Sequence, residues 1–247
     1  MAWFRGAFFV AYMAIITVVM GAICLPALAF GYQAASACIR AWSRLMLGSL
    51  RVICGVRLNL QGQGHIPQGA AIVAANHHSM WETIALYALL PKATLVFKEE
   101  LLRIPVYGWW GIKAGNIVID RNAGAKSYRK MSREVKSRLD DGRQVVIFPE
   151  GTRAPADQVL PFQPGIAGLY GQANVYCTPT VHNSGDHWLH PGPAKTPGTI
   201  TLRFLPALEP GLQKRVFLER LEGTMRANHK TLGDDGEEVF EIGQALV

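Results

Sequence analysis

The sequence predicts an α/β fold, in which a mixed, largely parallel sheet is flanked by helices and preceded by an N-terminal membrane-embedded helical element. Two observations lead to this prediction. After residue 60, short apolar runs alternate with stretches of helical periodicity, which is typical of a sheet covered by helices. Residues 7–30 contain no charged side chain, and about 20 apolar residues suffice to cross the hydrocarbon core of a bilayer.

The N-terminal element consists of two consecutive segments. After the apolar run at residues 7–30, residues 34–58 carry four arginines among aliphatic and aromatic side chains. This pattern predicts an amphipathic helix at the membrane interface, with its arginines near anionic headgroups and its aliphatic side chains in the acyl boundary. We expect residues 1–58 to form one membrane-anchoring unit and residues 59–247 to form one globular domain.

A secretory signal peptide is the alternative interpretation of the apolar run. Arg5 precedes the run, and Ala27-Leu28-Ala29 resembles a cleavage site. The run is nevertheless longer than the apolar region of a signal peptide, and it continues into a second lipid-compatible helix instead of a polar mature start. Arginines lie on both sides of the run, so the positive-inside rule favours a cytoplasmic globular domain and allows either a spanning or a re-entrant segment.

The elements predicted after residue 60 follow one another without an internal repeat or a low-complexity linker. The predicted strands are residues 70–75, 94–97, 117–119, 145–148, 175–181 and 199–205. The predicted helices are residues 83–90, 125–139 and 165–172, followed by a last amphipathic helix whose apolar face consists of Leu212, Val216, Leu221 and Met225. This order predicts a single domain.

The composition restricts the partners of the protein. The formal net charge of +7 favours an anionic partner. The basic residues are scattered and form no nucleic-acid reader motif, so we expect lipid or phosphate and no nucleic acid. The four cysteines have no CxxC spacing, which indicates neither a zinc site nor a disulfide framework. His182, His187 and His190 stand among loop-forming glycine and proline residues, so we expect no metal site there.

Two polar clusters directly follow two of the predicted strands. Residues 76–82 read NHHSMWE after the run at 70–75, and residues 149–153 read PEGTR after the run at 145–148. Polar side chains at the carboxyl ends of strands are typical of a site at the carboxyl edge of an α/β sheet. The two clusters together indicate an enzyme.

The spacing of His77 and Glu82 restricts how their side chains can meet. On a continuous helix, two residues five positions apart are rotated by about 140°. The pair can meet if His77 lies in the strand-to-helix turn and Glu82 in the early helix, with Asn76 or Ser79 as the N-cap. Glu82 would then fix the tautomer of the ring and leave the other ring nitrogen free as a base for a substrate hydroxyl. The alternative is that His77 caps the helix and Glu82 is a solvated surface group.

Four ordered blocks of residues resemble the glycerolipid acyltransferase superfamily, and within it the bacterial 1-acyl-sn-glycerol-3-phosphate acyltransferases. The blocks are residues 76–82, residues 98–101 (KEEL) with residues 115–121 (GNIVIDR), residues 148–153 (FPEGTR), and the Thr-Pro-Thr stretch at residues 178–180. Two residues depart from the usual pattern. Glu82 stands where many members have Asp, and His78 replaces the more usual glutamine.

The resemblance implies an acyltransferase in which His77 is the base and Glu82 its partner. It implies that Arg121 and Arg153 hold an acceptor phosphate with Lys98 as a helper. The residues it assigns to substrate binding are Lys98, Arg121, Glu150, Gly151, Thr152 and Arg153. The expected reaction moves a fatty acyl group from acyl-CoA or acyl carrier protein to the sn-2 hydroxyl of 1-acyl-sn-glycerol 3-phosphate (lysophosphatidic acid). The product is phosphatidic acid, and neither a cofactor nor a metal is implied.

The resemblance also implies a place in the cell and leaves alternatives open. We expect the protein in the cell inner membrane, in contact with membrane lipids and with its catalytic domain on the cytoplasmic side. One alternative is transfer to another lysolipid, such as a lyso-ornithine lipid. The other is a membrane lipid-binding protein that keeps the fold without catalysing a reaction.

Overall fold

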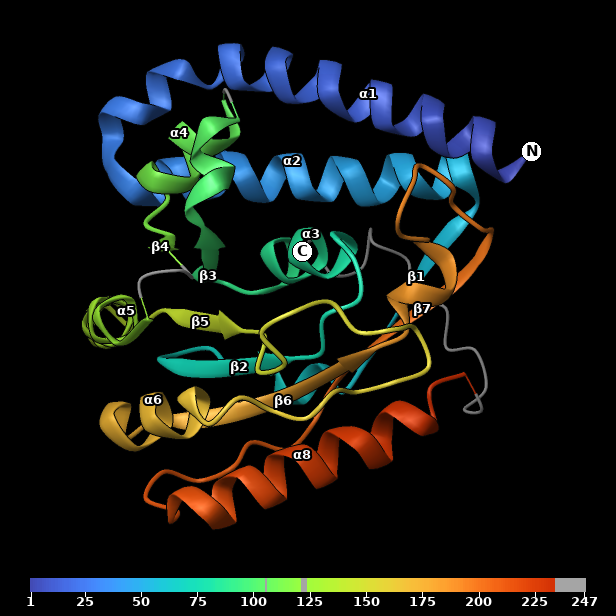
Figure 1. The fold of residues 1–247 in the computed structure, drawn as a ribbon. Helices are drawn as coiled ribbons and strands as arrows, with labels where there is room; N and C mark the ends of the chain where they lie inside the picture. The colour runs from blue at the N-terminus through green and yellow to red at the C-terminus, as the bar shows by residue number, and fades with distance from the viewer. Residues whose placement is uncertain (105, 121–123, 234–247) are drawn as a thin grey trace.

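The computed structural model describes residues 1–104, 106–120 and 124–233 (Figure 1). The helices are α1 (Ala2–Ile23), α2 (Gly31–Cys54), α3 (Trp81–Leu89), α4 (Tyr107–Lys113), α5 (Gly124–Asp140), α6 (Gly165–Ala173), α7 (Ser184–His187) and α8 (Lys214–Lys230). The strands are β1 (Val56–Gln61), β2 (Ala71–Ala75), β3 (Ala93–Lys98), β4 (Ile117–Ile119), β5 (Gln144–Ile147), β6 (Tyr176–His182) and β7 (Gly198–Phe204). Short 3-10 turns lie at Leu25–Phe30, Gln63–His65 and Glu99–Arg103.

In the described part of the chain, the strands form one sheet in the order β1-β7-β6-β2-β5-β3-β4. The strands from β6 to β4 are parallel to their neighbours. β7 runs antiparallel to β6 and parallel to β1. The sheet is therefore mixed and largely parallel, as the sequence predicts. β2 lies between β6 and β5, so the segment that follows β2 emerges in the middle of the sheet edge.

Helices cover both faces of the sheet. The helices α1, α2 and α3 lie on one face, and α6 and α8 lie on the other (Figure 1). One core cluster contains Leu47 of α2 and Leu86 of α3, whereas a second contains Val135 of α5, Leu169 of α6 and Phe217 of α8. Every residue of β2 and of β5 is buried, as is expected for strands covered on both faces.

The first helix, α1, is long and apolar enough to cross a membrane, judged by its length and composition. It runs antiparallel to α2 and lies along it (Figure 1). Trp42 of α2 donates a hydrogen bond of 3.1 Å from its indole nitrogen to the hydroxyl of Thr17. The outer face of α1 exposes large apolar side chains, namely Trp3, Phe4, Phe8, Ile15, Val18, Val19 and Ile23. This exposed apolar face indicates that the protein associates with a membrane.

The start of α1 is also fixed to the globular domain. The ring of Phe9 meets the ring of Trp188 edge-on, with 5.8 Å between their centroids. Gly6 lies so close to the chain that a Cβ atom there would come within 2.0 Å of the carbonyl oxygen of Pro193. Both ends of α1 therefore contact the same folded unit.

The segment expected to be an interfacial helix at residues 34–58 differs from that prediction in two ways. The helix α2 ends at Cys54, and residues 56–58 belong to β1, which pairs with β7. The buried face of α2, which includes Met46 and Leu50, packs into the first core cluster and does not face lipid. Arg40 donates a hydrogen bond to the carbonyl oxygen of Pro91. The prediction was wrong for this face because an apolar helical stripe fits a protein core as well as a bilayer.

Two other elements depart from the predicted pattern. The short helix α4 was not predicted, because its sequence, YGWWGIK, contains two glycines and less than two full turns of helical periodicity. In α8 the buried residues are Phe217, Leu221 and Met225. Phe217 therefore occupies the buried position that the prediction gave to Val216, and Leu212 precedes the helix.

Candidate active site

The two polar clusters lie at the ends of adjacent parallel strands. β2 pairs with β5 in a register that places Ala74 opposite Ile147. Asn76 follows β2 and Pro149 follows β5, so the segments 76–82 and 149–153 leave the sheet at the same edge. The backbone amide of Ala154 donates a hydrogen bond of 2.7 Å to the carbonyl oxygen of His77, which joins the two segments directly.

The side chains of His77 and Glu82 form a close pair. Nδ1 of His77 lies 2.7 Å from Oε1 of Glu82. His77 lies in the turn after β2, and Glu82 is the second residue of α3, so the strand-to-helix geometry is the one that the spacing requires. The ring of His77 stacks on Phe148 with 4.4 Å between centroids. Its side chain keeps 16% of its surface exposed, whereas that of Glu82 is fully buried. Nε2 of His77 therefore remains available to a substrate.

The carboxylate of Glu82 accepts hydrogen bonds at both oxygens. Oε1 accepts from the backbone amides of His78 at 2.9 Å and Ser79 at 2.8 Å, in addition to His77. Oε2 lies 2.8 Å from the hydroxyl of Ser79 and 2.9 Å from that of Ser184. Burial alone would raise the pKa of Glu82, but the imidazoles of His182 and His77 and the amide of Ser79 outweigh it and hold the pKa below its usual range. Glu82 is therefore ionised at neutral pH.

The end of β6 supplies further support that sequence reasoning missed. Asn76 and His182 exchange hydrogen bonds: the side-chain amide of Asn76 donates to the carbonyl oxygen of His182 at 2.9 Å, and the backbone amide of His182 donates to Oδ1 of Asn76 at 3.0 Å. Nε2 of His182 lies 2.8 Å from the carbonyl oxygen of Asn76 and therefore carries the proton. Asn76 thus ties β2 to β6. The N-cap of α3 is Met80 and neither Asn76 nor Ser79, so the N-cap prediction was wrong, although the hydroxyl of Ser79 accepts a hydrogen bond of 3.0 Å from the amide of Trp81.

The neighbouring histidine, His78, points into the protein. Its Nε2 lies 3.1 Å from the carbonyl oxygen of Gln158, and its ring contacts the rings of His182 and His229 edge-on. Burial, reinforced by His182, lowers the pKa of His78 to about 4. His78 is therefore neutral and buried, and His77 is the histidine of this pair that faces the site.

The segment after β5 is shaped by Glu150, which does not point toward solvent. Its Oε1 accepts a hydrogen bond of 3.1 Å from the backbone amide of His77, and its Oε2 accepts one of 3.3 Å from Leu160. Burial raises the pKa of Glu150 to about 7. Gly151 has a φ of 72°, which favours glycine at this turn. Glu150 thus fixes the backbone that carries His77.

The side chains expected to hold a phosphate are exposed around this edge. Thr152 and Arg153 follow the turn at Gly151, and Lys98 ends β3. Within the described residues, no hydrogen bond joins these three side chains to His77 or Glu82. Arg121 lies outside the described residues.

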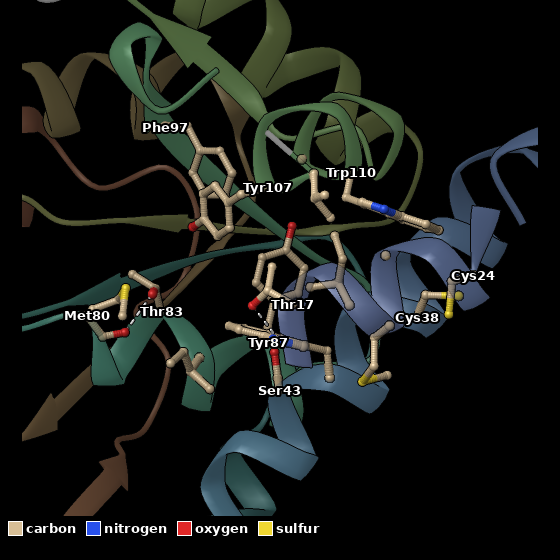
Figure 2. A pocket seen from close by; sticks show the side chains of 17 residues that line it. Thr17, Cys24, Cys38, Ser43, Met80, Thr83, Tyr87, Phe97, Tyr107 and Trp110 are labelled. Carbon is tan, nitrogen blue, oxygen red and sulfur yellow. Dashed lines mark hydrogen bonds between the residues drawn. The ribbon is translucent and has the colours of Figure 1, made fainter. Parts of the chain in front are cut away.

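An apolar cavity lies beside the histidine turn, between α1, α2, α3 and α4 (Figure 2). About 70 Å³ of it can be occupied by the centre of a water molecule, within about 670 Å³ of empty space that includes open solvent. The side chains of Met80, Phe97 and Trp110 are among those that line it. Met80 belongs to the same turn as His77, so the cavity begins within three residues of the catalytic candidate.

Comparisons with known proteins agree with this geometry. A sequence profile described as "Acyltransferase" matches residues 57–183, just over half of the chain. The chain belongs to this acyltransferase family. The more specific resemblance to 1-acyl-sn-glycerol-3-phosphate acyltransferases is confirmed as well, because proteins of that name are its relatives in bacteria, animals and plants.

Two relatives and one solved structure illustrate the similarity. The 1-acyl-sn-glycerol-3-phosphate acyltransferase of Pseudomonas aeruginosa is 34% identical over 170 residues, which is 69% of this chain and 66% of the relative. The human alpha enzyme is 32% identical over 166 residues, which is 66% of this chain and 59% of the relative. The match therefore spans less than two thirds of either relative. The crystal structure of the 1-acyl-sn-glycerophosphate acyltransferase from Thermotoga maritima superposes with a TM-score of 0.81 at 19% identity, covering 96% of this chain and 100% of that one.

Proposed function

We propose that the protein transfers a fatty acyl group from an acyl thioester to the sn-2 hydroxyl of 1-acyl-sn-glycerol 3-phosphate, giving phosphatidic acid. The observation that carries the proposal is the pair formed by His77 and Glu82, 2.7 Å apart, which occupies Nδ1 of a partly exposed ring and leaves Nε2 to act as the base. The names and sequences of the relatives support the same reaction. A protein that only binds lipid has no need of a histidine oriented by a buried carboxylate.

The proposed mechanism uses the ring as base and then as acid. Nε2 of His77 takes the proton of the acceptor hydroxyl while that oxygen attacks the thioester carbonyl carbon. The tetrahedral intermediate collapses, the carbon–sulfur bond breaks, and the thiolate leaves. The imidazolium, stabilised by Glu82, returns the proton to the sulfur. The acyl group ends on the acceptor oxygen, and His77 and Glu82 return to their starting protonation states.

The acceptor phosphate is held, in this proposal, by cationic side chains around the same edge. Arg153 follows the turn that Glu150 fixes to the amide of His77, so the guanidinium is carried by a segment already registered against the base. A guanidinium offers a bidentate fork that suits phosphate. Arg121 and Lys98 would complete the binding site, with Thr152 as an additional hydroxyl donor.

The helices α1 to α4 support a site for the acyl chain and a position at the membrane. The apolar cavity that begins at Met80 suits an acyl chain, since nearly all of its wall is apolar. Both ends of α1 contact the same domain, which supports a helix lying in one leaflet with its exposed apolar face in lipid. We place the protein in the cell inner membrane with the catalytic domain on the cytoplasmic side, because arginines lie on both sides of the uncharged run at residues 7–30, namely Arg5 before it and Arg40 after it.

The reaction can be tested with the full chain purified in lipid nanodiscs. Wild-type protein should form phosphatidic acid from 1-acyl-sn-glycerol 3-phosphate and an acyl thioester. The variant His77→Ala should lose activity by about 10² to 10⁴-fold, the usual contribution of a general base. His65→Ala removes an exposed ring from a distant turn and serves as the matched control. A folded His77→Ala protein with near wild-type turnover would disprove the assignment.

The same assay separates the acceptor alternatives. An acceptor without a phosphate, such as a lyso-ornithine lipid, should be a poor substrate if Arg153 binds phosphate. Arg153→Ala should raise the KM for lysophosphatidic acid and leave the KM for the acyl donor unchanged. Faster turnover of the lyso-ornithine lipid, with no effect of Arg153→Ala, would favour the other acceptor.

A further inference from the structure

A cluster of three cations on α5 stands apart from the site described above. Lys126, Arg129 and Arg133, here called the basic cluster, line a hollow between α5 and α6. Tyr128, Ser132 and Gln172 complete its wall, so every lining residue is polar or charged except for the ring of the tyrosine. The spacing i, i+3, i+7 puts the three cations on one face of the helix.

The charges on the rest of α5 are compensated, which makes the basic cluster unusual. Lys130 lies 3.9 Å from Glu134, and Lys136 lies 2.9 Å from Asp140, each as an i, i+4 pair. Arg138 donates a hydrogen bond of 2.8 Å to the carbonyl oxygen of Gly115. Among the residues that the structure describes, no carboxylate forms a salt bridge with any member of the basic cluster. Like charges at these spacings destabilise a helix by about 0.2–0.5 kcal/mol per pair, so the folded chain gains nothing from their arrangement.

The hollow is connected to the active-site edge by direct contacts. The hydroxyl of Tyr128 donates a hydrogen bond of 3.0 Å to the carbonyl oxygen of Gly165, the first residue of α6. Gln163 lies two residues before Gly165, and its backbone amide donates a hydrogen bond of 2.8 Å to the carbonyl oxygen of Pro149. Through Tyr128 and the residues before α6, the wall of the hollow is thus linked to the segment 149–153, and the basic cluster extends about 10 Å along α5, at 1.5 Å per residue.

The hollow does not belong to the apolar face of the molecule. Val135 of α5 and Leu169 of α6 pack in the second core cluster, on the opposite face of the sheet from the cluster that contains Phe9 of α1. The helix α1, which carries the exposed apolar side chains, lies on the other side of the sheet (Figure 1). A ligand of the basic cluster therefore approaches from the aqueous side, which excludes the headgroups of the bilayer that α1 contacts.

We propose that the basic cluster binds the phosphates at the nucleotide end of acyl-CoA. This inference rests on the proposed acyl transfer, in which an acyl thioester must bring its carbonyl to His77. The nucleotide end of CoA carries a diphosphate and a separate phosphate, and three cations beside the side-chain amide of Gln172 match such a polyanion. The site is a hollow between two helices and not a ridge, so it admits phosphate groups more readily than the acidic helix of a carrier protein.

The test compares two double variants of the full chain that each remove two charges from α5. Arg129→Ala/Arg133→Ala should raise the KM for acyl-CoA at least about tenfold, with kcat and the KM for lysophosphatidic acid changed less than about twofold. Lys130→Ala/Lys136→Ala, the matched control, should change the KM for acyl-CoA less than about twofold. Transfer from an acyl-N-acetylcysteamine thioester, which lacks the nucleotide, should be equal in wild type and Arg129→Ala/Arg133→Ala.

A binding measurement keeps this inference separate from the proposed function. Adenosine 3′,5′-bisphosphate, titrated calorimetrically, should bind the wild type at least about tenfold more tightly than Arg129→Ala/Arg133→Ala. Equal binding and an equal KM for acyl-CoA would overturn the inference, as would a loss confined to acyl carrier protein as donor. Absence of acyl transfer from any donor by the wild type would refute the proposed function, and the titration would still decide whether the basic cluster binds the nucleotide.

Discussion

The hydroxyl of Ser184 lies 2.9 Å from Oε2 of Glu82, although 102 residues separate the two in the sequence. Ser184 is the first residue of α7, directly after β6, and is fully buried. With Ser79, it holds the carboxylate oxygen that does not face His77. The orientation of the base therefore depends on β6 as well as on the turn after β2.

Removing this hydroxyl should slow turnover without weakening substrate binding. A hydrogen bond to a charged group contributes about 1.5–3 kcal/mol, so we expect Ser184→Ala to lower kcat by about tenfold or more and to leave both KM values unchanged. Steady-state kinetics and the melting temperature of the same preparation measure the two effects separately.

Thr180→Val is the matched control for Ser184→Ala. The hydroxyl of Thr180 is buried in β6 and has no hydrogen-bond partner within the described residues, so its removal should not change kcat. An equal loss of kcat in both variants would mean that β6 acts through general packing.

The charge and reach of Glu82 can be varied independently. In the wild type, one carboxylate oxygen of Glu82 accepts from His77 and the other accepts from Ser79. The side-chain amide in Glu82→Gln has a single acceptor oxygen, so either the ring of His77 or the serine hydroxyls lose their acceptor. We expect kcat to fall by about 10² to 10⁴-fold. Glu82→Asp keeps the charge on a side chain that is one methylene shorter and should retain more activity than Glu82→Gln. The reverse order would show that charge on this residue is unimportant.

Acid should destabilise the protein through its buried histidines. Burial lowers the pKa of His78 and of His229 to about 4, from an ordinary value of 6.5. Below pH 6.5 the unfolded chain binds protons that the folded chain does not, so the stability that these rings contribute is present above pH 6.5 and lost as the pH falls toward 4. We expect the melting temperature to fall between pH 7 and pH 5.

The variant His78→Gln isolates one of these rings. It should lose less stability than the wild type over the same interval, because it has one fewer group to protonate. Glu150, whose pKa is raised to about 7, acts in the opposite sense, but it is present in both proteins and cancels in the comparison. His65→Gln changes an exposed ring and should follow the wild-type curve. A steeper decline for His78→Gln would contradict the prediction.

The contact between α1 and the domain can be tested at a glycine. Gly6→Ala would place a Cβ atom 2.0 Å from the carbonyl oxygen of Pro193, so the helix must shift. Overpacking of this kind costs about 1–3 kcal/mol, and the melting temperature should fall by several degrees. Gly48→Ala in α2 meets no atom within 4 Å and should stabilise the helix by about 0.5–1 kcal/mol. Equal effects of the two substitutions would argue against the docking of α1.

The sequence was sufficient to predict the pair of His77 and Glu82 but not the residues that hold Glu82 in place. The spacing allowed His77 and Glu82 to meet across a strand-to-helix turn, and the resemblance to the acyltransferases favoured this pairing over a solvated position for Glu82. The contribution of Ser184 was not predictable, since it requires knowing that β6 lies next to β2. A single sequence carries little information about which strands are neighbours.

The errors at the N-terminal region have a similar cause. The helix α2 was correctly predicted as amphipathic, but amphipathicity does not state whether the apolar stripe meets lipid or protein. Its residues Met46 and Leu50 meet protein. The strand β1 was absorbed into the predicted helix because Val56-Arg57-Leu58 continues the same mixture of apolar and basic residues.

The apolar cavity has walls from α1 and α2 as well as from α3 and α4. Thr17, Met20 and Gly21, near the end of the first helix, form one side of it. Deleting α1 to obtain a water-soluble fragment would therefore remove part of the cavity along with the exposed apolar helix. Such a fragment would be unsuitable for measuring chain-length selectivity, even with the residues around the base intact.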